Sequence, residues 1–217
     1  MNDNQVGTSM TREIKYLLYT PSDYDGAKPF PLLIFLHGMG ERGDDLDLVK
    51  KHGPPKEIEG GRELPFIVAS PQTRLGDQWS SSTVVWLVDD LKSKLNIDSD
   101  RVYLTGLSMG GYGTWETAIK HPDLFAAIVP ICGRGDPSRA DAIKSIPTWI
   151  FHGAKDQIVP IEHSRNMYEA LKQYGNVKFT VYPEAEHDSW TETYMNPKFY
   201  EWMLMQKRGQ PPVFPPD

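Results

Sequence analysis

The residues that could do chemistry begin with a serine in the most glycine-rich stretch of the chain. Ser108 is the centre of a G-x-S-x-G pattern, which follows the apolar run 101–107 and precedes the segment 111–122 with helical spacing. A serine on a sharp turn from strand to helix exposes its hydroxyl as a nucleophile, and the flanking glycines let strand and helix approach closely. The pattern predicts nucleophilic attack by Ser108 on a carbonyl carbon, with a purely structural glycine-rich turn as the alternative.

A serine hydroxyl is a poor nucleophile near neutral pH, so it needs a histidine as base and a carboxylate that orients the histidine. Asp156 follows the apolar run 147–153, and His187 follows the apolar run 177–183. Both residues come after the serine in the chain and at the expected ends of strands, which is the order that this serine motif requires. The spacing therefore predicts that Ser108, His187 and Asp156 act together in catalysis.

Acyl transfer also needs backbone N–H groups that stabilise the negative charge on the attacked oxygen. One predicted donor is Met109, at the N-terminus of the helix after the serine, where the helix dipole favours negative charge. The other is Met39, with Gly40 as the alternative, in the glycine-rich loop HGMGERG. Trp79 and Trp190 lie close to these motifs and are candidates for the substrate cleft, with packing in the core as the alternative for both.

Other residues fit these roles less well. Asp136 and Asp141 follow an earlier apolar run and are alternatives for the acid, but the position of Asp156 fits better. His37 precedes the serine in the chain, so we interpret it as a structural hydrogen-bonding residue. The only cysteine, Cys132, lies in an apolar run, which indicates a buried structural thiol and excludes an intramolecular disulfide.

Apolar runs and amphipathic segments alternate along the chain and must position these residues. The runs typical of strands are 12–20, 31–38, 65–71, 101–107, 126–133, 147–153 and 177–183. The segments with helical spacing are 82–95, 111–122, 163–175 and 198–208. This alternation predicts a mostly parallel α/β sheet with helices on both faces. The connection 133–146 is too short for a large cap domain.

The chain is expected to form one domain with a tail at each end. Its 217 residues suffice for one sizeable core. We expect a flexible tail over residues 1–10, a single α/β domain over residues 11–208, and a proline-rich tail over residues 209–217 that is extended on the surface or disordered.

Composition argues against several classes of function. The net charge is −6 and lysine and arginine do not cluster, so no nucleic-acid partner is expected. No apolar run reaches 18 residues, so we expect no membrane association. We expect a soluble protein that is cytoplasmic by default, or secreted if a signal peptide has been removed. Because the sequence has no histidine–cysteine cluster and no dinucleotide motif, we expect no metal and no other cofactor.

Five stretches resemble the α/β-hydrolase superfamily: PLLIFLHGMGERGDD, RVYLTGLSMGGYGTW, HPDLFAAIVPICG, FHGAKDQIVP and EHDSW. Within it they are similar to the lidless phospholipase/carboxylesterase group, also described as predicted peptidases, which is close to feruloyl esterases and polyhydroxybutyrate depolymerases. The resemblance covers about residues 28–206. It implies the α/β-hydrolase fold and a serine esterase with Ser108 as nucleophile, His187 as base and Asp156 as acid.

The expected function is hydrolysis of short-chain or aryl carboxylic esters, either small molecules or esters linked to a polymer. Two alternatives stay open, a serine peptidase of the same fold and a non-catalytic binding module. The intact set of Ser108, Asp156 and His187 argues against the binding module, because a module without activity has no need of all three.

Overall fold

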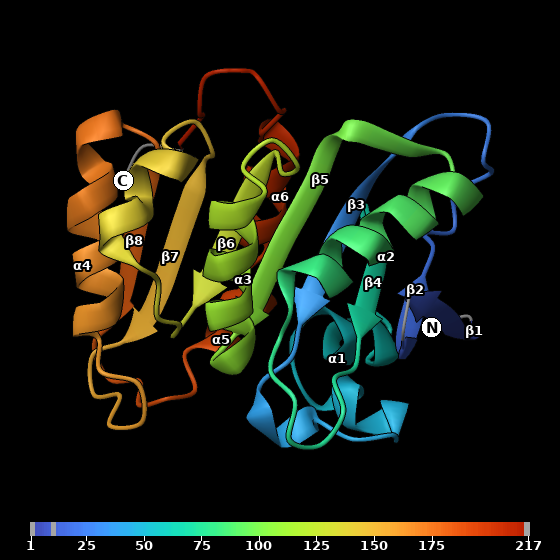
Figure 1. The fold of residues 1–217 in the computed structure, drawn as a ribbon, viewed down its shortest axis with the longest axis horizontal. Helices are drawn as coiled ribbons and strands as arrows, with labels where there is room; N and C mark the ends of the chain where they lie inside the picture. Colours follow the sequence, from blue (N-terminus) through green and yellow to red (C-terminus); the bar gives the residue numbers. More distant parts are fainter. Residues whose placement is uncertain (1–2, 10–11, 215–217) are drawn as a thin grey trace.

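A central β-sheet organises the molecule. The computed structural model describes residues 3–9 and 12–214, and the side chains of residues 14–214. In this part of the chain eight strands lie side by side (Figure 1), in the order β1 (Asp3–Ser9), β2 (Arg12–Tyr19), β4 (Ile67–Pro71), β3 (Phe30–Leu36), β5 (Ile97–Leu107), β6 (Ala127–Ile131), β7 (Thr148–Gly153) and β8 (Val177–Tyr182).

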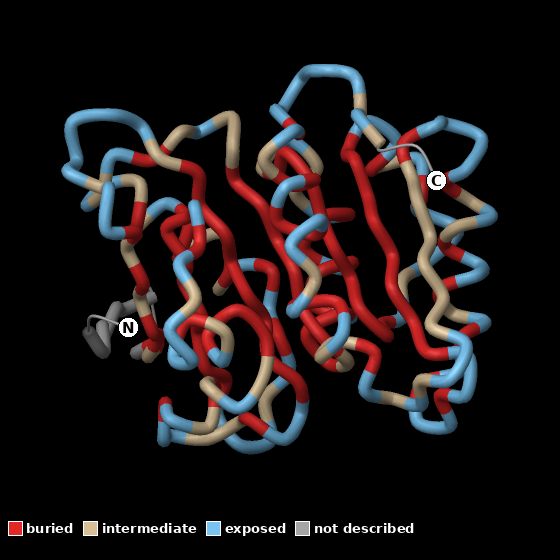
Figure 2. The backbone as a smooth tube through the Cα atoms, turned by 180° about the vertical axis from the view of Figure 1, so that it is seen from behind, coloured by how far each residue is buried: buried red, intermediate tan, exposed pale blue. Residues whose placement is uncertain are grey.

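The sheet is mostly parallel. Neighbouring strands run parallel from β4 through β8, whereas β1 and β2 form an antiparallel edge next to β4. The central strands are buried along almost their whole length (Figure 2), because helices cover both faces of the sheet. Burial on both faces explains the continuous apolar runs in the sequence, and the predicted fold class is confirmed.

Helices pack on the two faces of the sheet (Figure 1). One face is covered by α2 (Ser81–Lys94), α3 (Met109–Lys120) and α4 (Glu162–Leu171). The other face is covered by α1 (Gly53–Glu59), α5 (Trp190–Met195) and α6 (Pro197–Met205). Short 3-10 helices complete the connections: η1 (Met39–Glu41), η2 (Leu46–Lys51), η3 (Pro137–Ile143) and η4 (Lys172–Tyr174). Each face has its own hydrophobic cluster.

The connection between β6 and β7 contains only the short helix η3. As the sequence predicts, it forms no large cap domain over the carboxyl ends of the strands. None of the helices among the described residues is long and apolar enough to cross a membrane.

The N-terminal segment differs from the prediction of a flexible tail over residues 1–10. Asp3–Ser9 form β1, which pairs antiparallel with β2 from Asp3 opposite Leu18 to Ser9 opposite Arg12. Such a pair is held mainly by backbone hydrogen bonds, so a polar sequence such as DNQVGTS gives little periodic signal. The other residues of the predicted tail, 1–2 and 10, lie outside the described residues.

The C-terminal segment lies on the surface of α6. The Val213 carbonyl accepts hydrogen bonds from Trp202 Nε1 (2.8 Å) and Gln206 Nε2 (2.8 Å). The Phe214 ring stacks on Trp202 with centroids 5.7 Å apart. Residues 209–214 are thus extended on the surface, one of the two alternatives predicted for the tail. Residues 215–217 lie outside the described residues.

Candidate active site

Ser108 lies on a tight turn between β5, which ends at Leu107, and α3, which begins at Met109. Its φ is +52° and its ψ −115°, a strained region for any residue other than glycine. The Ser108 N–H donates to the Ile131 carbonyl (3.0 Å), and the Tyr112 N–H donates to the Ser108 carbonyl (3.1 Å). These two bonds hold the strained turn that carries the serine hydroxyl out of the sheet at the carboxyl end of β5.

The glycines of the G-x-S-x-G pattern are needed because backbone lies directly against backbone. A Cβ added to Gly110 would lie 1.9 Å from the carbonyl oxygen of Leu36 at the end of β3. A Cβ added to Gly106 would lie 2.4 Å from the carbonyl oxygen of Gly110. Neither contact can be relieved by rotating a side chain, so only glycine lets α3 pack this close to the sheet.

The Gly110→Ala variant should be strongly destabilised. The clash with the Leu36 carbonyl is expected to cost about 3 kcal/mol. For a chain of this size that lowers Tm by about 10 °C in a thermal melt. Gly40→Ala is the matched control, because a Cβ there meets nothing within 4 Å, and its Tm should equal that of the unaltered protein. A Gly110→Ala variant that melts like the control would contradict the close approach.

Ser108, His187 and Asp156 form a continuous chain of hydrogen bonds. His187 Nε2 lies 2.9 Å from Ser108 Oγ, and His187 Nδ1 lies 2.7 Å from Asp156 Oδ2. An ionised carboxylate only accepts, so Nδ1 carries the proton and Nε2 is free to accept from the serine hydroxyl. The structure brings together the three residues that the sequence selects, from the loops after β5, β7 and β8.

The Asp156 carboxylate is held as an ionised acceptor. Its side chain is fully buried, and its second oxygen, Oδ1, accepts from the backbone N–H groups of Ile158 (2.8 Å) and Val159 (2.9 Å). Burial raises the pKa of this carboxyl, but the hydrogen bonds from His187 and from the two N–H groups outweigh it, so the pKa lies below its usual value. The carboxylate therefore stays charged opposite His187.

A second histidine, His152, contacts the same carboxylate oxygen. His152 Nε2 lies 3.2 Å from Asp156 Oδ2 and 2.8 Å from the Val159 carbonyl, while Nδ1 lies 2.7 Å from Ser164 Oγ. Burial lowers the pKa of His152, which favours a neutral ring with its proton on Nε2. The sequence indicates a scaffold residue at the end of a strand for His152, and its spacing of four residues from Asp156 was a usable signal for this contact.

The two predicted oxyanion donors each begin a helix, Met39 in η1 and Met109 in α3. N–H groups in a first helical turn have no acceptor within the helix and are available to an outside acceptor. The loop after β3 touches the end of β5, since a Cβ on Gly38 would lie 2.7 Å from Leu107 Cδ1. The loop that carries Met39 and Gly40 therefore lies against the end of β5, next to Ser108 in the chain, and the role of the two donors stays a prediction.

His37 and Trp79 support the loop after β3 from inside the core. His37 Nε2 accepts from the Thr73 N–H (3.1 Å) and Nδ1 donates to the Gly38 carbonyl (2.6 Å). Burial lowers the pKa of His37 to about 4, so the ring is neutral, in agreement with a structural role. Trp79 donates from Nε1 to the His37 carbonyl (2.9 Å) and is buried. This burial favours packing in the core, the alternative that the sequence left open for Trp79.

Trp190, by contrast, lies next to the histidine of the site. Its ring meets His187 edge to face, with centroids 5.1 Å apart and planes at 90°. Its Nε1–H donates to His52 Nδ1 (3.3 Å), and His52 Nε2 lies 3.7 Å from the buried carboxylate of Glu41. The prediction that Trp190 contacts substrate stays open. No sequence pattern connects His52 and Glu41 with Trp190, because the loops that meet here are far apart in the chain.

Cys132 lies directly behind the site. Its sulfur, a ring nitrogen of His187 and a carboxylate oxygen of Asp156 all lie within 4.8 Å of one another. A metal would need the thiolate, but burial raises the pKa of Cys132 to about 12. Because His187 is hydrogen-bonded to both Asp156 and Ser108, these residues fit a chain of hydrogen bonds better than a metal centre. The thiol is free and buried, as the sequence predicts.

The alternative acids lie in and before η3 and have other roles. Asp136 accepts from the backbone N–H of Ser138 (3.0 Å) and caps η3, and Asp141 is an exposed residue within that helix. The carboxylate that accepts the hydrogen bond from His187 Nδ1 is that of Asp156, as its position in the sequence favours.

Comparison with known proteins gives concordant matches. The model of the phospholipase/carboxylesterase family matches residues 75–199. The bifunctional acetylxylan esterase/xylanase of Neocallimastix patriciarum is 26% identical over 98% of this chain and 33% of its own length. A thermostable esterase of known structure is 35% identical, with a TM-score of 0.83, over 95% of this chain and 64% of that one. A ferulic acid esterase of known structure is 16% identical, with a TM-score of 0.72, over 93% of this chain and 98% of that one, and it shares the fold.

This chain thus spans about a third of the length of the bifunctional relative. The family match covers more than half of the chain and includes Ser108, Asp156 and His187. The structural match to the thermostable esterase extends over nearly the whole described fold. The chain belongs to the phospholipase/carboxylesterase family and has the α/β-hydrolase fold.

Proposed function

We propose that this protein hydrolyses carboxylic esters through an acyl-enzyme intermediate on Ser108. The observation that carries the proposal is the hydrogen-bonded chain from Ser108 through His187 to Asp156, on a strained turn at the carboxyl end of β5. A serine bonded to a base that is itself oriented by an acid is the arrangement that activates a hydroxyl for attack. Membership of the phospholipase/carboxylesterase family supports an ester as the substrate.

The reaction proceeds in two acyl transfers. Ser108 Oγ forms a bond to the ester carbonyl carbon while its proton moves to His187 Nε2 and the carbonyl π electrons move to the oxygen. The tetrahedral intermediate then collapses, the carbon–oxygen ester bond breaks, and the leaving alcohol takes the proton from Nε2. Water attacks the acyl-enzyme by the same route and releases the carboxylic acid. Asp156 stays ionised and stabilises the imidazolium in both steps.

The backbone N–H groups of Met39 and Met109 are proposed to bind the oxyanion. Met109 lies at the N-terminus of α3, where the helix dipole stabilises negative charge. Donors fixed in place before the reaction stabilise the transition state without further reorganisation.

The favoured substrates are esters with short acyl or aryl groups, free or attached to a soluble polymer. Exposed side chains near the site include Met39 at 56% and Ile158 at 71% of full exposure, and η3 adds no lid. An open site of this kind buries little of a long acyl chain. An acetylxylan esterase and a ferulic acid esterase among the similar proteins support small acyl or aryl groups.

Acyl-chain length tests this substrate class. Each methylene adds about 0.8 kcal/mol when it is buried, so kcat/KM should rise only while the site covers the added carbons. With p-nitrophenyl esters we expect a maximum between acetate and butyrate and no interfacial activation. A steady rise to acyl chains of about twelve carbons would contradict an open site and indicate an apolar tunnel.

The nature of the scissile bond is tested with one acyl group on two leaving groups. p-Nitrophenyl butyrate should be hydrolysed, and the corresponding p-nitroanilide should be hydrolysed far more slowly. Faster turnover of anilides or peptides would favour the serine peptidase. An intact protein that is not labelled by a fluorophosphonate and turns over none of these compounds would favour the binding module.

A further inference from the structure

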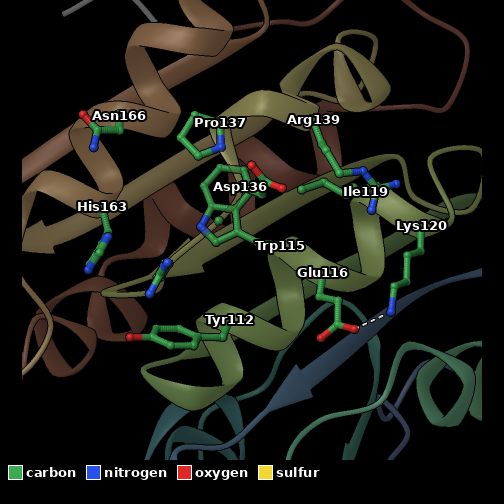
Figure 3. Close-up of a pocket in the computed structure, with 12 residues that line it drawn as sticks. Tyr112, Trp115, Glu116, Ile119, Lys120, Asp136, Pro137, Arg139, His163 and Asn166 are labelled. Carbon is green, nitrogen blue, oxygen red and sulfur yellow. Dashed lines mark hydrogen bonds and ion pairs between the residues drawn. The ribbon is translucent and has the colours of Figure 1, made fainter.

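A cavity of about 780 Å³ lies beside α3, between this helix, η3 and α4. Figure 3 shows Tyr112, Trp115 and Glu116 on α3 at one side, Pro137 and Arg139 above them, and His163 and Asn166 on α4 across the space. The volume is that of a site for a small organic ligand. None of the functional groups described above occupies this cavity.

The polar groups of the cavity are mostly donors without partners. Among the described residues, the side chains of Arg134, Arg139, His163 and Asn166 form no hydrogen bond and no ion pair, although all four line the cavity. Of the two acids, Glu116 is paired with Lys120 (dashed line in Figure 3). The other, Asp136, accepts from both the N–H and the hydroxyl of Ser138. Free arginine donors therefore dominate the cavity of a chain whose net charge is −6.

Trp115 adds a buried donor to the lining. Its ring is completely buried, yet its Nε1–H has no partner in the described part of the chain. A buried donor left without an acceptor costs about 1–3 kcal/mol. A ligand or ordered water that brings an acceptor into this cavity, with a small movement of the ring, would remove that cost. The unpartnered Trp115 N–H and the free arginines together indicate a ligand rich in acceptor oxygens.

Tyr112 connects the cavity with the turn that carries Ser108. Tyr112 lines the cavity one helical turn after Ser108 and donates its N–H to the Ser108 carbonyl. Burial raises the pKa of Tyr112, the Arg134 guanidinium opposes that rise, and the Asp156 carboxylate adds to it. The Tyr112 ring therefore lies within the electrostatic reach of both the cavity and the site. Arg134 follows Cys132 by two residues, and the Cys132 sulfur lies close to His187.

We propose that this cavity binds a carboxylate group carried by the ester substrate, with Arg134 as the principal binding residue and Arg139 further along the cavity. This inference rests on the proposed ester hydrolysis and specifies its substrate class as anionic esters. Guanidinium groups match carboxylates in both charge and geometry, and unpaired arginines in a concave surface select such a group. Short substrates without a carboxylate react without using the cavity.

The test compares matched pairs of charged and neutral esters. For a carboxylate on the acyl half, the pair is mono-p-nitrophenyl adipate and the p-nitrophenyl ester of adipamic acid. For a carboxylate on the leaving half, the pair is 3-acetoxybenzoate and 3-acetoxybenzamide. Each pair differs only in charge at one end, so the ratio of kcat/KM within a pair reports binding of the carboxylate.

Arg134→Gln is expected to lower the charged-to-neutral ratio of kcat/KM about twofold to fivefold in one of the two pairs, because Arg134 is exposed and its ion pair with the carboxylate is solvated. The pair that responds identifies the half of the ester that enters the cavity. Turnover of the neutral ester should be unchanged, and Arg134→Lys should restore part of the ratio. Arg165→Ala is the matched control, since Arg165 lies on α4 outside the cavity and pairs with Glu162. About 0.5 M NaCl should reduce the ratio in the unaltered protein.

The outcomes separate the two proposals. If the unaltered protein hydrolyses the esters but the ratios in both pairs are the same in Arg134→Gln, the carboxylate site is wrong and ester hydrolysis stands. An equal drop in Arg165→Ala would also overturn the carboxylate site, because it would indicate a general field effect. If neither charged nor neutral esters are hydrolysed by a correctly folded protein, the proposed function itself fails.

Discussion

Replacing Ser108 by alanine is expected to lower kcat for ester hydrolysis by about 10⁵-fold or more and to abolish covalent labelling by a fluorophosphonate. The hydroxyl removed is the one that His187 Nε2 contacts at 2.9 Å, and no other hydroxyl is bonded to that nitrogen among the described residues. The remaining site can still bind ester and stabilise an oxyanion, so a small residual rate above that in water is expected.

The fold should survive this change. Alanine keeps the Cβ of serine, so the strain at φ +52° is the same, and the backbone bonds to Ile131 and from Tyr112 do not involve the side chain. Tm should therefore stay within about 2 °C of the unaltered protein, less than the shift expected for 1 kcal/mol. If Ser108→Ala keeps both its Tm and more than about a hundredth of the activity, the nucleophile is another residue, because loss of a nucleophile costs far more.

Strands and reacting residues could be predicted because the same physical constraint acts on both. A parallel strand covered on two faces must be continuously apolar, and its carboxyl end is where the chain turns to polar residues. Asp156 and His187 could therefore be selected from the ends of β7 and β8 without any knowledge of the packing. Chain order supplied the rest, because the acid and the base follow the serine in this motif.

Helix faces and irregular connections were harder to predict. In α2 the buried face includes Val84 together with Leu87, Val88 and Leu91, whereas Val85 is only half-buried. The two valines are adjacent, and only the packing against the sheet selects one of them. Residues 39–64 are polar, yet they form η1, η2 and α1 and bury residues such as Val49 and Ile58. Short helices with one or two apolar residues have no periodic pattern to detect.

Contacts between loops could not be predicted at all. The edge-to-face packing of Trp190 on His187, and its hydrogen bond to His52, join residues separated by more than 100 positions in one case. Such contacts depend on how far each strand extends and how each loop folds back. The same holds for Arg134. Its sequence context is that of an ordinary loop residue, and only the fold places it in the lining of the cavity beside α3.

The second large effect is expected for Asp156→Asn, which should lower kcat by about 10³- to 10⁴-fold with the fold retained. The Asp156 oxygens are not equivalent: Oδ1 accepts from two backbone N–H groups, which cannot become acceptors. The asparagine oxygen must therefore occupy the Oδ1 position, and its NH₂ group must face His187 Nδ1. A donor at that place forces the His187 proton onto Nε2, which can then no longer accept a proton from Ser108.

Buried His152 strengthens this expectation and provides a check on it. Its Nε2–H lies 3.2 Å from the oxygen that becomes the NH₂ group, so the variant also brings two donors together. A stability loss of about 1–2 kcal/mol, measured by thermal melting, should accompany the loss of activity. Asp136→Asn is the control, because that exposed residue caps η3 away from His187, and it should keep nearly full activity. Nearly full activity in Asp156→Asn together with a large loss in Asp136→Asn or Asp141→Asn would show that the acid has been misassigned.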